Sequence, residues 1–88
     1  MSDSVAVSRP PVELWFIMVE HRDGRIERAG NPYRSERLAA DWRGFVEGYY
    51  TKAKRVFVEH FRAVFDGESL TEESAKLLDT RYNLDVKA

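Results

Sequence analysis

The tripeptide Val-Glu-His occurs twice in the chain, ending at His21 and at His60, and these are its only two histidines. Two imidazoles with one or two carboxylates would suit a divalent metal ion or acid–base catalysis. Adjacent residues of a β-strand point to opposite faces, however, so Glu20 and His21 cannot easily serve one site. The same holds for Glu59 and His60. We therefore expect two separate strand histidines, with no metal site.

No other pattern in the sequence indicates catalysis. The chain has no cysteine, which excludes disulfides, thiolate nucleophiles and zinc ribbons. It also lacks a phosphate-binding glycine loop, a nucleophile elbow and a His-Glu-x-x-His helix. Ser35 and Ser69 stand before helical patterns, where helix caps are expected. The sequence predicts a protein that is not an enzyme and needs no cofactor.

The composition is typical of one small globular domain. The 88 residues are 43% hydrophobic and 33% charged, and the net charge of −1 gives no general attraction to nucleic acid or membranes. The longest apolar run, Leu14 to Val19, is much shorter than the roughly 20 residues that cross a bilayer. The first residues lack the features of a signal peptide. We expect a soluble, cytoplasmic protein with no membrane contact.

A β-hairpin is predicted near the start of the domain. Residues 13–22 are dense in β-branched and aromatic side chains, and Asp23-Gly24 favours a two-residue type I′ turn into a second strand at residues 25–29. That register places His21 opposite Ile26. It puts Ile26 on the face that carries Trp15, Ile17, Val19 and His21. Since the first strand is apolar on both faces, we expect it to be central and covered on both sides.

An amphipathic helix is predicted over residues 35–49. Ser35 is a good N-cap, and four large apolar residues follow at helical spacing on one face: Leu38, Trp42, Phe45 and Tyr49. We expect this helix to cover one face of the sheet. Gly44 and Gly48 weaken it by about 1 kcal/mol each relative to alanine.

The second half of the chain is predicted to contain a third strand and a second helix. Residues 55–64 fit a strand better than a helix, although both patterns are present. Ser69-Leu-Thr-Glu72 resembles a capping box, and Ala75, Leu78 and Tyr82 mark the apolar face of a helix over residues 71–82.

The expected fold is α+β in the order β-β-α-β-α. It is a three-stranded antiparallel sheet with one helix on a face and a C-terminal helix. The alternative is an N-terminal β-hairpin followed by three helices. We expect residues 1–12 to be a flexible tail, residues 13–84 a single domain and residues 85–88 a frayed end.

The aromatic content points to a shared apolar surface. The chain has more large aromatic residues than one small core is expected to bury. They are Trp15, Phe16, Trp42, Phe45, Tyr49, Phe57, Phe61 and Phe65. We predict a protein-interaction module that self-associates through the sheet face opposite the first helix. The candidate partner-binding residues are Phe16, Met18, Phe61 and Phe65. In that case Phe16→Glu would give monomers that keep the fold.

The alternative function is an accessory nucleic-acid-binding domain. Residues 21–62 carry more basic than acidic side chains, and the basic ones fall largely in turns and at strand ends. These could contact phosphates, with Tyr33 or Tyr50 stacking on a base. The candidates are Arg22, Arg25, Arg28, Arg34, Lys52, Lys54 and Arg55. An ordinary charged surface that keeps sheet edges soluble is the favoured explanation, because nucleic-acid-binding domains commonly show a stronger basic excess.

Overall fold

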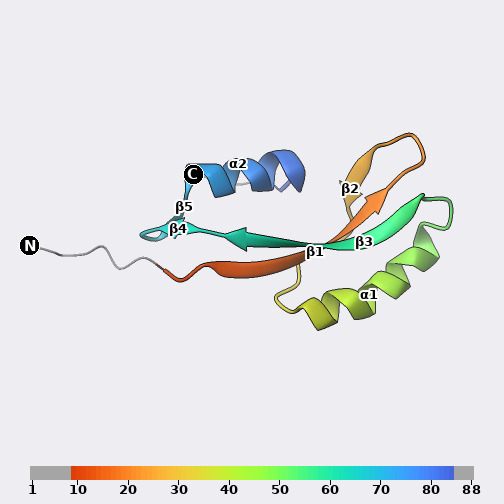
Figure 1. Cartoon of the computed structure of the whole chain (residues 1–88), viewed down its shortest axis with the longest axis horizontal. Coiled ribbons are helices and arrows are strands. Elements are labelled where there is room, and N and C mark those ends of the chain that lie inside the picture. The colour runs from red at the N-terminus through yellow and green to blue at the C-terminus, as the bar shows by residue number, and fades with distance from the viewer. Residues whose placement is uncertain (1–8, 85–88) are drawn as a thin grey trace, which may run out of the picture. The chain divides into compact units, whose positions relative to one another are not determined.

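The computed structural model describes residues 9–84, so most of the predicted tail and the predicted frayed end lie outside the described residues. The order of elements confirms the expected α+β fold, and the all-helical second half is wrong (Figure 1). The elements are β1 (Val12–Glu20), β2 (Ile26–Arg28), α1 (Glu36–Tyr49), β3 (Arg55–Ala63), β4 (Phe65–Asp66), β5 (Ser69–Leu70) and α2 (Glu72–Arg81).

Contacts group the chain into two compact units. The sheet unit comprises residues 13–61 and holds the hairpin, α1 and most of β3. Among the described residues, the C-terminal unit comprises residues 62–84 together with residues 9–12, and it includes β4, β5 and α2. A single domain over residues 13–84 stays a prediction.

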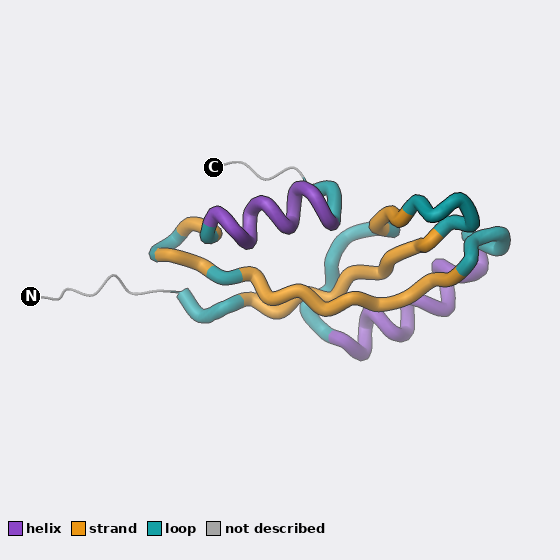
Figure 2. The backbone as a smooth tube through the Cα atoms, turned by 45° about the horizontal axis from the view of Figure 1, so that its top comes forward, coloured by secondary structure: helices purple, strands orange, loops and turns teal. Residues whose placement is uncertain are grey.

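The three-stranded sheet has the order β2-β1-β3, which confirms β1 as the central strand. The Lys54 amide donates to the Glu20 carbonyl at 2.8 Å, so the start of β3 lies beside the end of β1 and the two strands run antiparallel. Figure 2 shows the strands of the sheet unit side by side, with α1 running along them.

The hairpin register differs by one residue from the predicted one. Glu20 pairs with Ile26, Val19 with Glu27 and Met18 with Arg28. The turn is longer than two residues, because the Gly24 amide donates to the His21 carbonyl at 3.0 Å and the His21 amide donates to the Arg25 carbonyl at 2.8 Å. Gly24 has φ of 93° but Asp23 has no positive φ, as in a three-residue loop with a glycine bulge.

The extra turn residue changes the face to which Ile26 belongs. Residues paired across an antiparallel ladder share a face, so Ile26 lies with Glu20 and Met18 rather than with Ile17 and Val19. The assignment of Ile26 to the Ile17 face is therefore wrong. Ala29 takes that place, since its amide donates to the Ile17 carbonyl at 2.8 Å.

The core of the sheet unit lies between the sheet and α1. Ile17, Val19, Ala29 and Val56 are buried there, with Tyr33, Val46, Tyr50 and Ala53 packed against them. On β1, the four consecutive residues from Phe16 to Val19 are all buried, which confirms that both faces of this strand are covered.

In the C-terminal unit, β4 and β5 form a short hairpin that is absent from the fold expected from the sequence. Phe65 pairs with Leu70, and Gly67 takes the positive φ of the turn. Helix α2 begins after Thr71, whose side chain accepts a hydrogen bond from the Ser74 amide at 3.2 Å. Thr71 is thus the N-cap in place of Ser69, because Ser69 belongs to β5. Leu78 and Tyr82 are buried as predicted.

Replacing Ile17 with alanine should destabilise the protein by about 2–5 kcal/mol, because the side chain is fully buried beneath α1 and its loss leaves a cavity. Urea unfolding followed by circular dichroism measures this. Leu38→Ala is the matched control, since this apolar residue on α1 is half exposed, and its cost should be below about 1 kcal/mol. Equal costs would contradict the packing described above.

Candidate functional site

The apolar face of α1 that the sequence predicts as its sheet-packing face is largely exposed. Relative exposure is 49% for Leu38, 45% for Trp42, 56% for Phe45 and 74% for Tyr49. These four residues recur every three or four positions on one stripe of the helix. We call them the α1 ridge. Burial of this stripe against the sheet is therefore a prediction that the structure corrects.

A neighbouring stripe of the helix packs on the sheet instead. Ala39 is fully buried, and Val46 and Tyr50 pack against the core beneath α1. Alanine at this contact lets the helix backbone approach the strands closely. The larger side chains of the ridge consequently lie beside the contact between α1 and the sheet rather than within it. Helix α1 thus has an apolar surface wider than one side of the sheet can cover.

The ridge is held together by contacts between its aromatic rings. The centroids of Trp42 and Phe45 are 5.2 Å apart at 88°, and those of Phe45 and Tyr49 are 5.3 Å apart at 72°. Both are edge-to-face arrangements, which stabilise aromatic pairs beyond the area they bury. The exposed rings therefore form an ordered surface. A partner would lose little side-chain entropy on binding such a surface.

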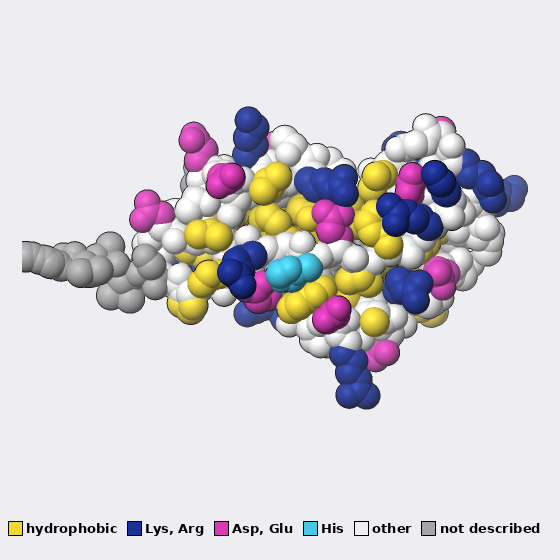
Figure 3. All heavy atoms as spheres, in the orientation of Figure 1, with side chains coloured by type: hydrophobic (Ala, Val, Ile, Leu, Met, Phe, Trp, Pro, Cys, Tyr) yellow, Lys and Arg dark blue, Asp and Glu magenta, His cyan; other side chains and the backbone are white. Residues whose placement is uncertain are grey.

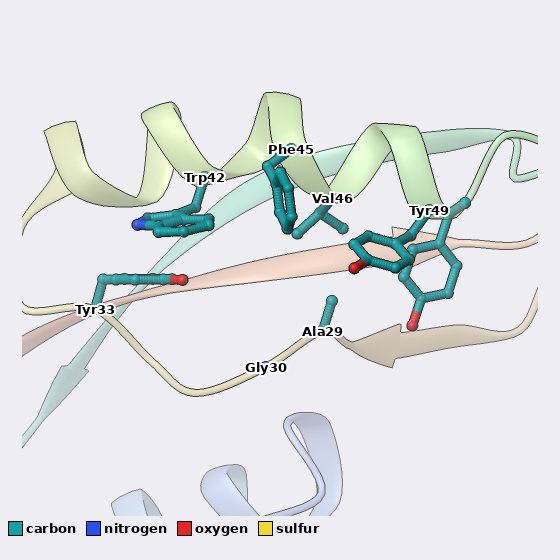
Figure 4. Close-up of a pocket in the computed structure, with 8 residues that line it drawn as sticks. Ala29, Gly30, Tyr33, Trp42, Phe45, Val46 and Tyr49 are labelled. Carbon is teal, nitrogen blue, oxygen red and sulfur yellow. The ribbon is translucent and has the colours of Figure 1, made fainter.

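A pocket of about 420 Å³ lies between the ridge and the loop that follows β2 (Figure 4). Tyr33 is fixed at its rim, because its backbone exchanges two hydrogen bonds of 2.8 Å with Trp15 on β1. The Tyr33 ring lies below Trp42 in the figure, while Ala29 and Gly30 lie on the loop. The aromatic surface therefore continues from the helix onto this loop.

Two glycines open a second hollow on α1. Gly44 and Gly48 line it with Phe45 and Tyr49. A Cβ built on either glycine would meet no atom within 4 Å, and neither glycine has positive φ. Packing within the chain therefore does not require glycine here. Each glycine nonetheless weakens the helix by about 1 kcal/mol.

The four predicted partner-binding residues do not form an exposed surface. Phe16, Met18 and Phe61 are buried in the folded chain, and the rings of Phe16 and Phe61 pack edge to face with centroids 6.3 Å apart. Phe65 is half-buried in the C-terminal unit, with the Arg9 guanidinium 4.2 Å from its ring centroid. A partner could contact Phe16 or Met18 only if the chain opened. Phe16→Glu is therefore expected to unfold the protein.

The two histidines lie near opposite ends of β1, with His21 just after this strand and His60 on the neighbouring β3. Each contacts a glutamate from an adjacent strand. His21 contacts Glu27 at 2.6 Å, and His60 contacts Glu13 at 2.5 Å. The His60 ring also packs against Trp15, with centroids 4.9 Å apart. Within residues 9–84, no three His, Asp or Glu side chains are close enough together to hold a metal ion.

Most of the predicted phosphate-binding residues gather at one end of the sheet unit. The Arg22 Nε donates to the Lys52 carbonyl at 3.1 Å, which joins the hairpin turn to the loop after α1. Lys54 and Arg55 follow in that loop and at the start of β3. Figure 3 shows Lys and Arg side chains over this end of the hairpin, with Asp and Glu between them.

The remaining two candidates lie away from that end. The Arg28 guanidinium donates to the Gly30 carbonyl at the other end of β2, and Arg34 lies just before α1. The predicted set is therefore two groups rather than one patch.

Glu20 neutralises part of the basic end. Its carboxylate is 2.6 Å from Arg55 Nε and 3.6 Å from Lys54 Nζ. The hydrogen bond from Arg55 lowers the pKa of Glu20 below its usual value despite partial desolvation, and the charge of Lys54 acts in the same direction. Arg25 similarly lies 3.8 Å from Glu27. These acids compete with any phosphate for the same cations.

The chain matches no family model, and neither a curated protein nor a solved structure is detectably similar to it. Neither helix in the described part of the chain is long and apolar enough to cross a membrane. Its function must therefore be inferred from its own surface.

One sequence signal could have identified the α1 ridge. Ala39, Val46 and Tyr50 form a second apolar stripe at helical spacing next to the ridge. A helix with two adjacent apolar stripes has more apolar surface than one sheet contact needs. The stripe with the larger residues, which periodicity and size favour as the sheet contact, is the exposed one.

Replacing Glu20 with glutamine should flatten the dependence of stability on pH between about 3 and 5. A carboxyl whose folded pKa lies below its unfolded value of about 4.3 adds stability above that value. This contribution is lost as the pH falls through the folded pKa. Glu20→Gln should therefore unfold more easily at pH 7 and lose less stability on acidification. Urea midpoints across this range measure both effects.

Glu47→Gln is the control for this experiment, since it removes an exposed pair with Arg43 on the surface of α1. Such surface pairs contribute about 0–1 kcal/mol. Parallel acid curves for wild type and Glu20→Gln would show that the Glu20 cluster does not contribute to stability.

Proposed function

We propose that the protein is a non-enzymatic interaction module that docks another protein through the α1 ridge. The observation that carries this proposal is the exposure of Leu38, Trp42, Phe45 and Tyr49 as one continuous helical stripe. Single exposed apolar residues are common on protein surfaces, but a contiguous apolar patch is typical of an interaction site. Aromatic residues are also the side chains most enriched at protein interfaces.

The charge around the ridge favours a protein over a nucleic acid. Helix α1 carries Glu36, Asp41 and Glu47 beside only two basic residues, Arg37 and Arg43. A surface with this composition does not attract phosphates. The mixture of signs fits the polar rim that surrounds the apolar centre of a protein interface.

Phe45→Asp should abolish docking without unfolding the protein, because Phe45 is the exposed centre of the ridge. Loss of a central aromatic typically weakens an interface by a factor of about 10 or more. Tagged protein that is chemically cross-linked in its source lysate should retain a partner protein, which includes a second copy of the chain, and Phe45→Asp should not. Circular dichroism should show the same helix content for both.

Leu77→Asp is the matched control. Leu77 is also exposed and helical, at 44%, but it lies on α2 in the C-terminal unit. This variant should retain the partner as wild type does. Equal retention by Phe45→Asp and wild type would rule out the ridge as the docking site.

Phosphate binding at the basic end of the sheet unit is the second candidate. It is favoured by the joining of Arg22 to the Lys52 backbone, which brings two basic segments together. Glu20 opposes it by pairing with Lys54 and Arg55. Any affinity of the wild-type protein for nucleic acid should therefore be weak and depend strongly on salt.

Fluorescence anisotropy of labelled mixed-sequence DNA and RNA at about 50 and 200 mM salt tests this candidate. Glu20→Gln should bind more tightly than wild type, since it releases two cations, whereas Glu47→Gln should not. Absence of binding by both wild type and Glu20→Gln at the lower salt would dispose of the second candidate.

A further inference from the structure

We infer that the partner of the α1 ridge is a second copy of this chain, and that two α1 helices pair antiparallel. In this pairing Phe45 of each copy lies over Gly44 and Gly48 of the other. The inference rests on the proposed docking function of the ridge and specifies what it docks.

The first argument is that α1 carries a ridge and a matching hollow side by side. Phe45 and Tyr49 form the edge of the hollow whose floor is Gly44 and Gly48. The exposed Ala40 lies one turn before Gly44 and extends the strip of small residues. A two-fold pair of identical surfaces brings the ridge of each copy to the hollow of the other. A helix therefore finds on its own copy the shape that its ridge requires.

The second argument comes from the glycines themselves. Neither Gly44 nor Gly48 is needed for a backbone conformation or for packing within the chain. Glycine is nevertheless the residue that allows another helix to approach most closely. A bulky aromatic from a second copy would use the space that no atom of the first copy occupies.

The third argument is electrostatic. Acidic and basic side chains alternate along α1, from Glu36 and Arg37 through Asp41 and Arg43 to Glu47. A second copy is therefore not repelled, as it would be from a helix of one sign. Antiparallel pairing also sets the two helix dipoles in opposition, which favours it over parallel pairing.

The size of the surface sets the strength of the pair. The exposed parts of the four ridge side chains amount to roughly 450 Å², taking about 200 Å² for each full side chain. Two copies would then bury about 900 Å² in total, less than the 1,200–2,000 Å² of stable interfaces. We therefore expect a reversible dimer with a Kd on the order of 10–100 µM.

Sedimentation equilibrium of the full chain, from about 5 to 500 µM, tests the inference because this range brackets the expected Kd. Wild type should fit a monomer–dimer equilibrium. The double variant Gly44→Ala/Gly48→Ala should raise Tm by roughly 6–16 °C, since alanine favours the helix, and should weaken dimerisation by about tenfold. A higher Tm together with weaker dimerisation would indicate that the new methyl groups fill the hollow. A damaged fold would instead lower the Tm.

Thr80→Ala is the control for the glycine variant. Thr80 is an exposed residue of α2, and alanine there favours a helix without altering α1. This variant should dimerise as wild type does. If the glycine variant gains stability and dimerises unchanged, the glycine hollow is not part of the interface and the inference is overturned.

Disulfide cross-linking tests the relative direction of the two helices. Because the chain has no native cysteine, only the introduced cysteines can react. Antiparallel pairing centred near Phe45 places Asp41 of one copy opposite Gly48 of the other. A mixture of Asp41→Cys and Gly48→Cys proteins should therefore form a mixed disulfide under mild oxidation at about 500 µM, a concentration that offsets the weaker pairing expected from a side chain at position 48. Disulfides formed only within each single variant would indicate parallel helices and overturn the pairing.

The outcomes separate the inference from the proposed function. A wild-type monomer at 500 µM, together with Phe45-dependent retention of another protein, would overturn self-pairing and leave the docking function standing. A monomer without any such retention would overturn both. A dimer that Phe45→Asp does not weaken would show that the copies meet elsewhere.

Discussion

The burial of four consecutive residues on β1, from Phe16 to Val19, is the constraint on which the rest of the structure depends. Successive strand residues point to opposite faces, so this run demands cover on both sides of the sheet. An 88-residue chain has few elements with which to supply it. In the sheet unit, one of those covers is α1.

The way in which α1 provides this cover explains the exposed ridge. Ala39, a small side chain, is fully buried on the side of α1 that also carries Val46 and Tyr50. The helix meets the core through Val46 and Tyr50, on the same side as the buried Ala39, and its largest residues lie beside that contact. The exposed ridge is thus a geometric consequence of how the helix meets the sheet.

The fold was largely predictable because strand and helix periodicities are strong in this chain. The central position of β1 followed from its two apolar faces, and α1 began at its predicted N-cap, Ser35. The hairpin register was not predictable, because Asp-Gly is compatible with both a two-residue and a three-residue turn. A single residue of difference then moved Ile26 to the other face.

The candidate site was less predictable for a physical reason. Sequence periodicity shows that a helix has an apolar side, but it does not show which of two adjacent apolar stripes meets the sheet. Residue size would suggest that Trp42 and Phe45 are core, yet the contact selects Ala39. Similarly, the repeated Val-Glu-His marks two strands but not one site, since each histidine contacts a glutamate from another strand.

The modest area of the α1 ridge has a consequence for how such a protein would behave in a cell. A contact of this size is too small to hold two copies together at every concentration. The fraction of paired molecules would instead rise with the amount of protein made. Whatever the paired form does would then switch on gradually with abundance, and dilution alone would switch it off.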